Sequence, residues 1–361
     1  MIKNKLNNFD IGTLTYFITR AFLTGYLFHS LLKLIKQDSW ITPIIGIIIG
    51  IIFILLTTYI FNYKPDLNLS EKLTTLFGKP IGIIMVIIFC LFCFFMCLLT
   101  YLNLNNFIQG QFLSKTPTTV ISFVLIIAIF YTLIKGINTI AKTGNILFFI
   151  AMILFFISLF GLTPFMEISN LKPFLNENPT NYIKALDCFY SFNITPILFL
   201  TIIPKSKINN PKLKKTLILS FLVSTITMFF VMFATISSFG YELASLFKYP
   251  EFHALKNISL MGLEARVESI LIIQCIFDFF MFVVLCIYFI ANSIKSLTNF
   301  KKINILYIIL CTILVLLTNY FSRYNVYLGD FALKYVHLPV TIFSTIFIII
   351  VCLVIKIKKS N

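Results

Sequence analysis

Apolar residues run along this chain in long, almost unbroken segments. Ten such segments can be read, each close to the ~20 residues that an α-helix needs to cross a bilayer. In chain order, as spans 1 to 10, they cover residues 11–34, 40–63, 81–108, 118–134, 141–162, 182–203, 217–239, 267–294, 303–321 and 336–355. The pattern predicts an all-α integral membrane protein with ten transmembrane helices in a single domain over residues 1–361.

The composition supports a membrane protein and excludes several functions. Hydrophobic residues make up 59% of the chain and charged residues only 12%, about half the charged share of a soluble domain. The eight Cys all lie in apolar segments and the three His are scattered, so we expect buried thiols, no metal site and no cofactor. The chain has no Ser/His/Asp arrangement and no phosphate-binding glycine loop, and we expect no enzyme activity.

The net charge of +16 predicts topology rather than nucleic-acid binding. If the N-terminus is cytoplasmic, most Lys and Arg residues fall in the connections on the cytoplasmic side, as in other membrane proteins. Ten spans then place both termini in the cytoplasm. The basic side chains would contact lipid headgroups.

Ten spans divide into two halves of five, and an odd number inverts the second half relative to the first. We expect repeat one over about residues 11–162 and repeat two over about residues 182–355. In transporters of this architecture the ligand site lies between interrupted helices in corresponding positions of the repeats. Spans 1 and 6 are both weakened, by Thr24–Gly25 and by the stretch SFNITP (191–196). For either span alone, a simple kink is the alternative interpretation.

Few ionisable residues lie within the spans, where charge is costly and often functional. Asp278 lies twelve residues after Arg266, which is ~18 Å along a helix, and Gln274 is one turn away on the same face. An isolated carboxylate at that depth would take up a proton or pair with a cation. Arg20 is the first candidate and Lys142 the second. The alternative for either cation is that it extends to the headgroups.

Several stretches together carry a family resemblance. They are QDSWITPIIGIIIGI (37–51), NLSEKLTTLFGKPIG (68–82), KTPTTV (115–120), LIKGINTIAKTGNILF (133–148), YPEFHALKNISL (249–260) and LEARVESILIIQCIFDFF (263–280). In this order and spacing, the chain resembles the B-subunit permeases of bacterial endospore germinant receptors. That family belongs to the amino acid–polyamine–organocation transporters.

The resemblance implies a leucine-transporter-like fold, with a midplane pocket between broken spans 1 and 6 and with spans 3 and 8 beside it. It also implies a permease-like domain that senses an L-amino acid or related nutrient. In the resembled fold, span 1 packs on span 8, so Arg20 and Asp278 would close the cytoplasmic side. In related proton-coupled permeases a fifth-span lysine, here Lys142, replaces a sodium ion.

The sequence departs from the family at three places. Lys142 stands where the family usually has Arg, no Trp lies near Gln274, and the first-span interruption lacks a run of glycines. These departures concern the ligand more than the fold.

An amino acid ligand needs free backbone N–H groups for its carboxylate and free carbonyls for its ammonium. We expect Thr24 and Gly25 in span 1 to supply them together with Ser191–Asn193 in span 6, which includes Phe192. Tyr101 in span 3 could add a hydrogen bond from the side, although packing is the commoner role for such a residue.

The resemblance further implies two partner subunits, a membrane subunit with a soluble domain and a lipoprotein. The location would be the bacterial cytoplasmic membrane or the inner membrane of the spore. A proton-coupled amino acid transporter is the main alternative function, and a channel or scaffold without a small ligand is a third.

Overall fold

The computed structural model describes residues 5–209, 211–256, 268–298, 300–322 and 331–360. The regular elements within these residues are all helices, joined by turns and short irregular connections, and one isolated bridge links Leu6 to Ile208. Residues 263–267, the start of the sixth stretch that carried the family resemblance, lie outside the described part.

Eight helical runs in the described part are long and apolar enough to cross a membrane, so the prediction of a multi-pass membrane protein is confirmed. They are Asn8–Asn62, Lys79–Gln111, Ile137–Phe165, Pro179–Ile202, Leu213–Phe239, Ser269–Thr298, Ile303–Phe321 and Lys334–Lys358. The first run contains predicted spans 1 and 2, and predicted span 4 is the shorter apolar helix Thr118–Ile134. The count of ten and the inverted repeat stay predictions.

The helices of the first half follow the predicted segments closely. They are α1 (Asn8–Arg20), η1 (Leu23–Leu27), α2 (Phe28–Ile35), η2 (Lys36–Trp40), α3 (Ile41–Asn62), α4 (Leu69–Phe77), α5 (Lys79–Gln111), α6 (Thr118–Ile134) and α7 (Ile137–Leu162).

Two short 3₁₀ helices, η3 and η4, follow α7, and the helices of the second half come after them. The elements are η3 (Thr163–Phe165), η4 (Ile168–Leu171), α8 (Pro179–Phe189), η5 (Tyr190–Ile194), η6 (Thr195–Ile202), η7 (Lys205–Lys207), α9 (Leu213–Phe239), α10 (Tyr241–Leu246), α11 (Pro250–Lys256), α12 (Glu268–Thr298), α13 (Ile303–Phe321), η9 (Ala332–Val336) and α15 (His337–Ser360).

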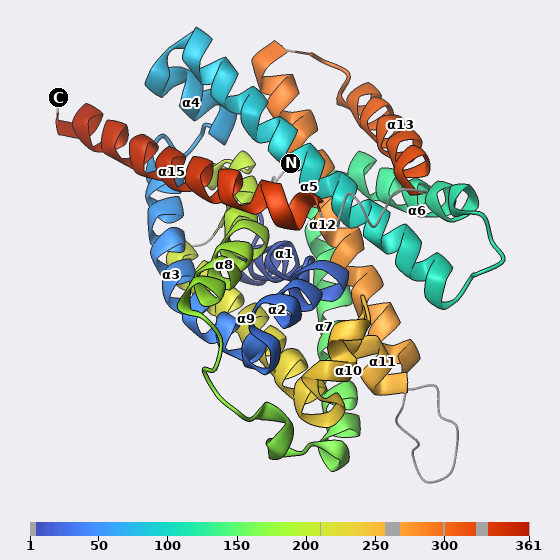
Figure 1. The fold of residues 1–361 in the computed structure, drawn as a ribbon. Coiled ribbons are helices and arrows are strands. Elements are labelled where there is room, and N and C mark those ends of the chain that lie inside the picture. Colours follow the sequence, from blue (N-terminus) through green and yellow to red (C-terminus); the bar gives the residue numbers. More distant parts are fainter. Residues whose placement is uncertain (1–4, 210, 257–267, 299, 323–330, 361) are drawn as a thin grey trace.

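Helix α1 lies at the centre of the molecule and packs against α7, α9 and α12 (Figure 1). It begins at a capping box in which Asn7 and Asp10 exchange side-chain-to-backbone hydrogen bonds, both at 2.8 Å. These bonds satisfy N–H groups that the first turn of a helix leaves free. The sequence therefore fixes where the central helix starts.

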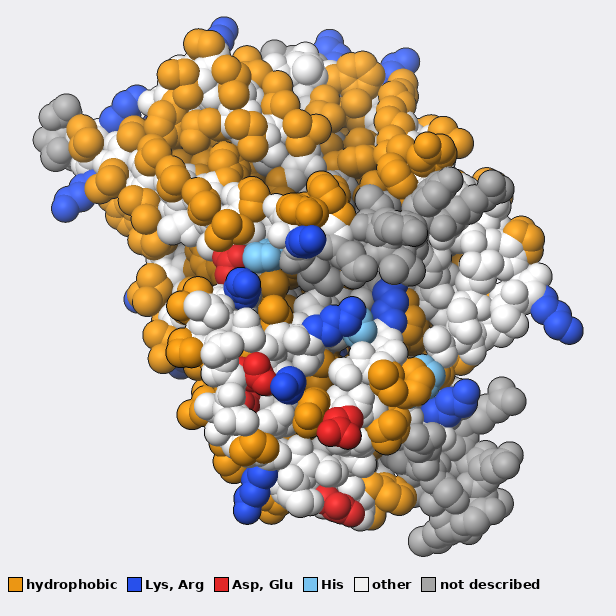
Figure 2. Space-filling view, in the orientation of Figure 1, with side chains coloured by type: hydrophobic (Ala, Val, Ile, Leu, Met, Phe, Trp, Pro, Cys, Tyr) orange, Lys and Arg blue, Asp and Glu red, His pale blue; other side chains and the backbone are white. Residues whose placement is uncertain are grey.

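The outer helices turn apolar side chains outward. Ile48 on α3, Phe160 on α7 and Leu316 on α13 are each more than 60% exposed. Figure 2 shows hydrophobic side chains covering the upper part of one face, with Lys and Arg at its margins. Such a surface is typical of contact with lipid, because lipid carries no penalty for exposed apolar atoms.

Two connections pack against the helices rather than extending away from them. In α4 the buried Lys72 ammonium donates to the carbonyls of Ile60 (2.9 Å) and Phe61 (3.2 Å) in the last turn of α3. Helices α10 and α11, between α9 and α12, bring Tyr249 and Glu251 into the interior. The second of these connections reaches the site described next.

Candidate ligand site at the interrupted helices

Predicted span 1 is interrupted where the sequence indicated. Thr24 has φ −81° and ψ 126°, and Gly25 has φ 82° and ψ −12°, between α1 and α2. The positive φ suits glycine because it has no Cβ to clash with the neighbouring carbonyl. The prediction of a break at Thr24–Gly25 is confirmed.

Predicted span 6 is interrupted differently from the expectation. Helix α8 passes into the π-helical turn η5 and then into the 3₁₀ helix η6, with Thr195 and Ile194 still in the right-handed helical region. Pro196 has no N–H to donate, which explains a change of hydrogen-bonding pattern at this point. The segment changes helix type without opening into extended residues, so the predicted break is present only in this weaker form.

The two interruptions lie against one another. The Asn193 side-chain amide donates to the carbonyl of Thr19 in α1 at 2.9 Å. The rings of Phe22 and Phe192 lie with their centroids 5.1 Å apart. Two segments about 170 residues apart in the sequence are thus brought into direct contact at the interruption.

At the break, the carbonyl of Thr24 is hydrogen-bonded by a side-chain amide from another helix. Asn103 on α5 donates to the carbonyl of Thr24 at 2.8 Å, and the Tyr249 hydroxyl donates to the Asn103 side-chain oxygen at 3.0 Å. A Cβ added to Gly25 would lie 2.6 Å from both side chains. The site is therefore closed around Gly25 by two residues that the sequence analysis did not select. The three asparagines in the apolar stretch TYLNLNNF (100–107) were the available signal for Asn103.

A charged cluster lies one turn before the break. Arg20 and Asp278 approach to 3.5 Å, with side chains only 3% and 7% exposed. The hydrogen-bonding environment orients the Gln274 amide so that its oxygen accepts from Arg20 at 2.9 and 3.1 Å. The Arg20 guanidinium also donates to the Tyr16 hydroxyl. The predicted pairing of Arg20 with Asp278, and the place of Gln274 beside it, are present.

Lys142 does not join this cluster. Its ammonium lies 3.1 Å from Asp10 at the start of α1, and its side chain is 62% exposed. Asn145, one turn further along α7, donates to the same carboxylate oxygen at 2.7 Å. The prediction that Lys142 could pair with Asp278 is wrong, because α7 places its side chain near the first turn of α1.

The hydroxyls of Tyr101 and Ser191 donate hydrogen bonds to carbonyls other than those of Thr24 and Gly25. The Tyr101 hydroxyl donates to the carbonyl of Ser122 on α6, so this residue connects α5 to α6. The Ser191 hydroxyl donates to the carbonyl of Asp187, one turn earlier in α8. The contact of Tyr101 with α6 is compatible with packing between helices, and a role of Tyr101 in ligand binding stays a prediction.

Glu251 is a third residue near the site, beside Asn103 and Tyr249, that the sequence did not indicate. It is 1% exposed, and neither carboxylate oxygen meets a donor in hydrogen-bonding geometry within the described part of the chain. Burial raises the pKa of Glu251 to about 7, although its own backbone, the Thr24 hydroxyl and Arg20 favour the charged form. Its position in the loop stretch YPEFHALK gave no sign of burial.

A small cavity of about 20 Å³ adjoins Glu251, enough for about one water-sized group. Its lining includes Gln274 on α12, Ser158 on α7 and Thr235 on α9. Among the residues that the structure places, the Thr235 hydroxyl has no hydrogen-bond partner, like the Glu251 carboxylate. Among the residues that the structure describes, no three His, Cys, Asp or Glu side chains gather as metal ligands.

Comparison with protein families supports the resemblance. A family model described as "Spore germination protein" matches residues 15–326. "Spore germination protein XB" of Bacillus anthracis is 23% identical over 305 residues, which cover 84% of each chain. "Spore germination protein A2" of Bacillus subtilis (strain 168) is 24% identical over 261 residues, or 72% of this chain and 71% of the relative.

Solved transporter structures share the fold. A Na⁺-coupled sialic acid symporter in a substrate-bound outward-open state has a TM-score of 0.64 at 12% identity, over 94% of this chain and 78% of the symporter. MHP1, a nucleobase-cation-symport-1 family transporter in a closed conformation, has a TM-score of 0.61 at 11% identity, over 90% of this chain and 75% of MHP1. Both have the leucine-transporter fold.

Proposed function

The chain belongs to the spore germination protein family, and from that premise we propose that it binds an amino acid or similar small nutrient at the interrupted helices. The binding would contribute to a spore germinant receptor and trigger germination. The observation that carries the proposal is the opened backbone at Thr24–Gly25 in the interior of a transporter fold. Asn103 donates to the Thr24 carbonyl, and Asn193 of the second interruption donates to Thr19 in α1.

The ligand would replace contacts that the protein now makes with itself. Asn103 satisfies the Thr24 carbonyl and Asn193 satisfies the Thr19 carbonyl, and either amide can turn toward a ligand. A carbonyl so released accepts from an ammonium group, and the N–H groups where a helix restarts after the break donate to a carboxylate. A zwitterion is the class of ligand that satisfies both.

Glu251 supplies a second place for the ammonium group. A buried carboxylate without a donor is held neutral by a proton or balanced by a cation. Glu251 lies close enough to Thr24 and Arg20 for both to influence its charge. An ammonium group bound beside Thr24 would take the place of that proton.

The Arg20–Asp278 pair would hold the cytoplasmic side closed. It joins α1 to α12 on the side of the break toward the start of α1. Separating the two charges in the interior is costly unless water or a ligand compensates. A movement of α1 at the break would therefore need a compensating event at the site.

The proposed assembly follows the family. It consists of ten spans in two inverted halves of five, with both termini cytoplasmic, in the inner membrane of the spore or the cytoplasmic membrane. Its partners would be a membrane subunit with a soluble domain and a lipoprotein.

A binding screen tests the ligand site. Purified protein would be heated with each of the twenty amino acids, and a bound ligand would raise the midpoint of thermal unfolding. We expect at least one amino acid to stabilise the wild type and to lose this effect in Asn193→Ala, while Asn170→Ala, in the η4 connection, keeps it. Equal stabilisation of both variants would place binding elsewhere, and no stabilisation at all would favour a scaffold.

The second candidate is a proton-coupled amino acid transporter, which the buried Asp278 and the symporter fold favour. It predicts uptake into proteoliposomes that is driven by a proton gradient and abolished by Asp278→Asn. Ligand binding without uptake would favour the receptor.

A further inference from the structure

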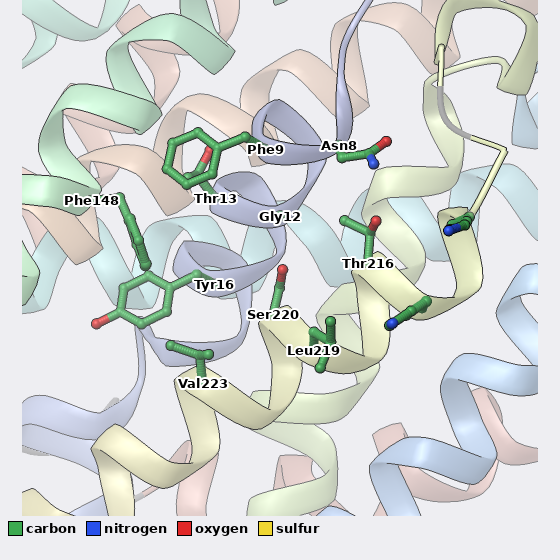
Figure 3. A pocket seen from close by; sticks show the side chains of 12 residues that line it. Asn8, Phe9, Gly12, Thr13, Tyr16, Phe148, Thr216, Leu219, Ser220 and Val223 are labelled. Carbon is green, nitrogen blue, oxygen red and sulfur yellow. The ribbon is translucent and has the colours of Figure 1, made fainter.

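A groove of about 480 Å³ runs between three helices near the start of α1. Helices α1, α7 and α9 form it (Figure 3). Its lining comprises Asn8, Phe9, Gly12, Thr13, Tyr16, Phe148, Lys212, Lys215, Thr216, Leu219, Ser220 and Val223.

Most of the groove surface is apolar, and part of its lining is exposed. Phe9 and Tyr16 on α1 hold Phe148 of α7 between them, with ring centroids 5.8 and 4.9 Å apart. On the opposite wall Leu219 is 50% and Val223 38% exposed. From Asn8 to Tyr16 the groove follows eight residues of helix, about 12 Å, which is most of one leaflet of a hydrocarbon core about 30 Å thick.

One end of the groove is positively charged. Helix α1 begins at Asn8 and α9 begins at Leu213, after Lys212 as its N-cap. The start of α9 has no side-chain cap and presents first-turn N–H groups and the positive end of its helix dipole, whereas the first turn of α1 is capped by Asn7 and carries Asp10. Lys212 and Lys215 add formal charge, and none of the lining residues is acidic.

We propose that this groove binds an anionic phospholipid, with an acyl chain along Phe9, Phe148 and Leu219 and the phosphate between Lys212 and Lys215. The apolar length of the groove favours a lipid over free phosphate. The basic end favours an acidic headgroup over a zwitterionic one.

A lipid in the groove would contact α1, the helix that precedes the break at Thr24–Gly25. One wall of the groove is α1, which carries Arg20 and ends just before Thr24. At Gly12, a Cβ would lie only 2.7 Å from the Ser220 hydroxyl, so α1 and α9 are in close contact along the groove. A lipid seated there would resist movement of α1 away from α9 and stabilise the closed form.

Neighbouring lysines on one turn of α9 give a matched test. Lys215 lines the groove, whereas the exposed Lys214 does not. Wild type, Lys214→Gln, Lys215→Gln and Lys212→Gln/Lys215→Gln would be titrated with phosphatidylglycerol in phosphatidylcholine nanodiscs. Thermal unfolding and native mass spectrometry of retained lipid would be recorded. We expect the affinity for phosphatidylglycerol to fall about fivefold in Lys215→Gln and about thirtyfold in the double variant, with Lys214→Gln unchanged.

Three results would overturn the proposal. They are equal losses in Lys214→Gln and Lys215→Gln, retention of phosphatidylcholine as strong as that of phosphatidylglycerol, or full stabilisation by inorganic phosphate alone. The assay uses no nutrient, so it is independent of the proposed ligand site.

A second variant tests the apolar part without changing charge. Leu219→Trp would fill the groove and displace the acyl chain, and we expect it to lower retention of phosphatidylglycerol. Ile48→Trp places the same side chain on the lipid-facing surface of α3 and serves as the control. Equal retention in the two variants would contradict a lipid in the groove.

Discussion

Gly25 is the residue whose backbone conformation opens the first membrane segment. Its φ of 82° belongs to the left-handed region, which residues with a side chain enter at a cost of ~1–2 kcal/mol. The Asn103 and Tyr249 side chains lie where a Cβ would project. At the residue scale, one missing side chain thus permits both the turn and the packing around it.

Gly25→Ala should lower the midpoint of thermal unfolding and weaken amino acid binding, because it adds strain and displaces Asn103 from the Thr24 carbonyl. Gly110→Ala is the control, since Gly110 lies in α5 and no described residue comes within 4 Å of its added Cβ. There alanine should be neutral or slightly stabilising. If both variants behave alike, the conformation at Gly25 is not specially constrained.

Glu251 predicts a pH dependence. Its pKa in the folded protein, about 7, lies above its ordinary value of 4.5, so between these values the native state holds a proton that the unfolded chain has released. The contribution to stability is therefore largest below pH 4.5, declines as the pH rises to 7, and is constant above that. We expect the midpoint of thermal unfolding of the wild type to decrease as the pH is raised from 5 to 7.5.

Glu251→Gln should reduce this dependence and raise stability at pH 8, because the amide is neutral at every pH. Glu242→Gln, at an exposed position in α10, should leave the wild-type profile intact. An unchanged profile in Glu251→Gln would assign the pH dependence to other groups.

At the scale of elements, helix ends depend on side chains from neighbouring segments. The C-terminus of α3 receives the Lys72 ammonium from α4, and the N-terminus of α1 is linked to α7 through Asp10, Lys142 and Asn145. Carbonyls in the last turn of a helix lack partners within it. These contacts therefore fix how the connections pack against the spans.

Lys72→Met should destabilise the protein by ~1–3 kcal/mol, because two carbonyls lose their charged donor in a buried position. Lys79→Met changes an exposed lysine at the start of α5 and should have little effect. Chemical or thermal unfolding in detergent measures the difference. Comparable losses in both variants would mean that general surface charge, rather than the helix end, matters.

At the scale of the whole molecule, the Arg20–Asp278 pair joins the first and eighth predicted spans. Both groups are buried, so each depends on the other for compensation of its charge. Helix α1 is central and touches α7, α9 and α12, and the pair therefore couples the centre of the fold to one of its longest helices.

Asp278→Asn should cost ~3–5 kcal/mol, because it leaves a buried guanidinium without its carboxylate. The double variant Arg20→Gln/Asp278→Asn should be more stable than Asp278→Asn alone, since it removes the uncompensated charge. Unfolding of the wild type, both single variants and the double variant gives the coupling energy. Additive effects would show that the two charges do not depend on each other.

The sequence by itself determined the membrane class, the helical segments, the weak point at Thr24–Gly25 and the need of Asp278 for a proton or a cation, with Arg20 as the first candidate. These follow from local physics: apolar length sets a span, a glycine in a polar interruption permits a turn, and buried charge requires a partner. Span 6 was anticipated only in part, since Pro196 alters the hydrogen bonding of a helix without specifying whether it opens.

Only the tertiary structure decided which side chains meet the released backbone. Asn103, Tyr249 and Glu251 reach the break from a different span and from a loop helix, and Lys142 turns toward Asp10 instead of Asp278. These outcomes depend on how the helices rotate and pack against one another. Spacing along one segment cannot specify that arrangement, because it arises from contacts between residues far apart in the chain.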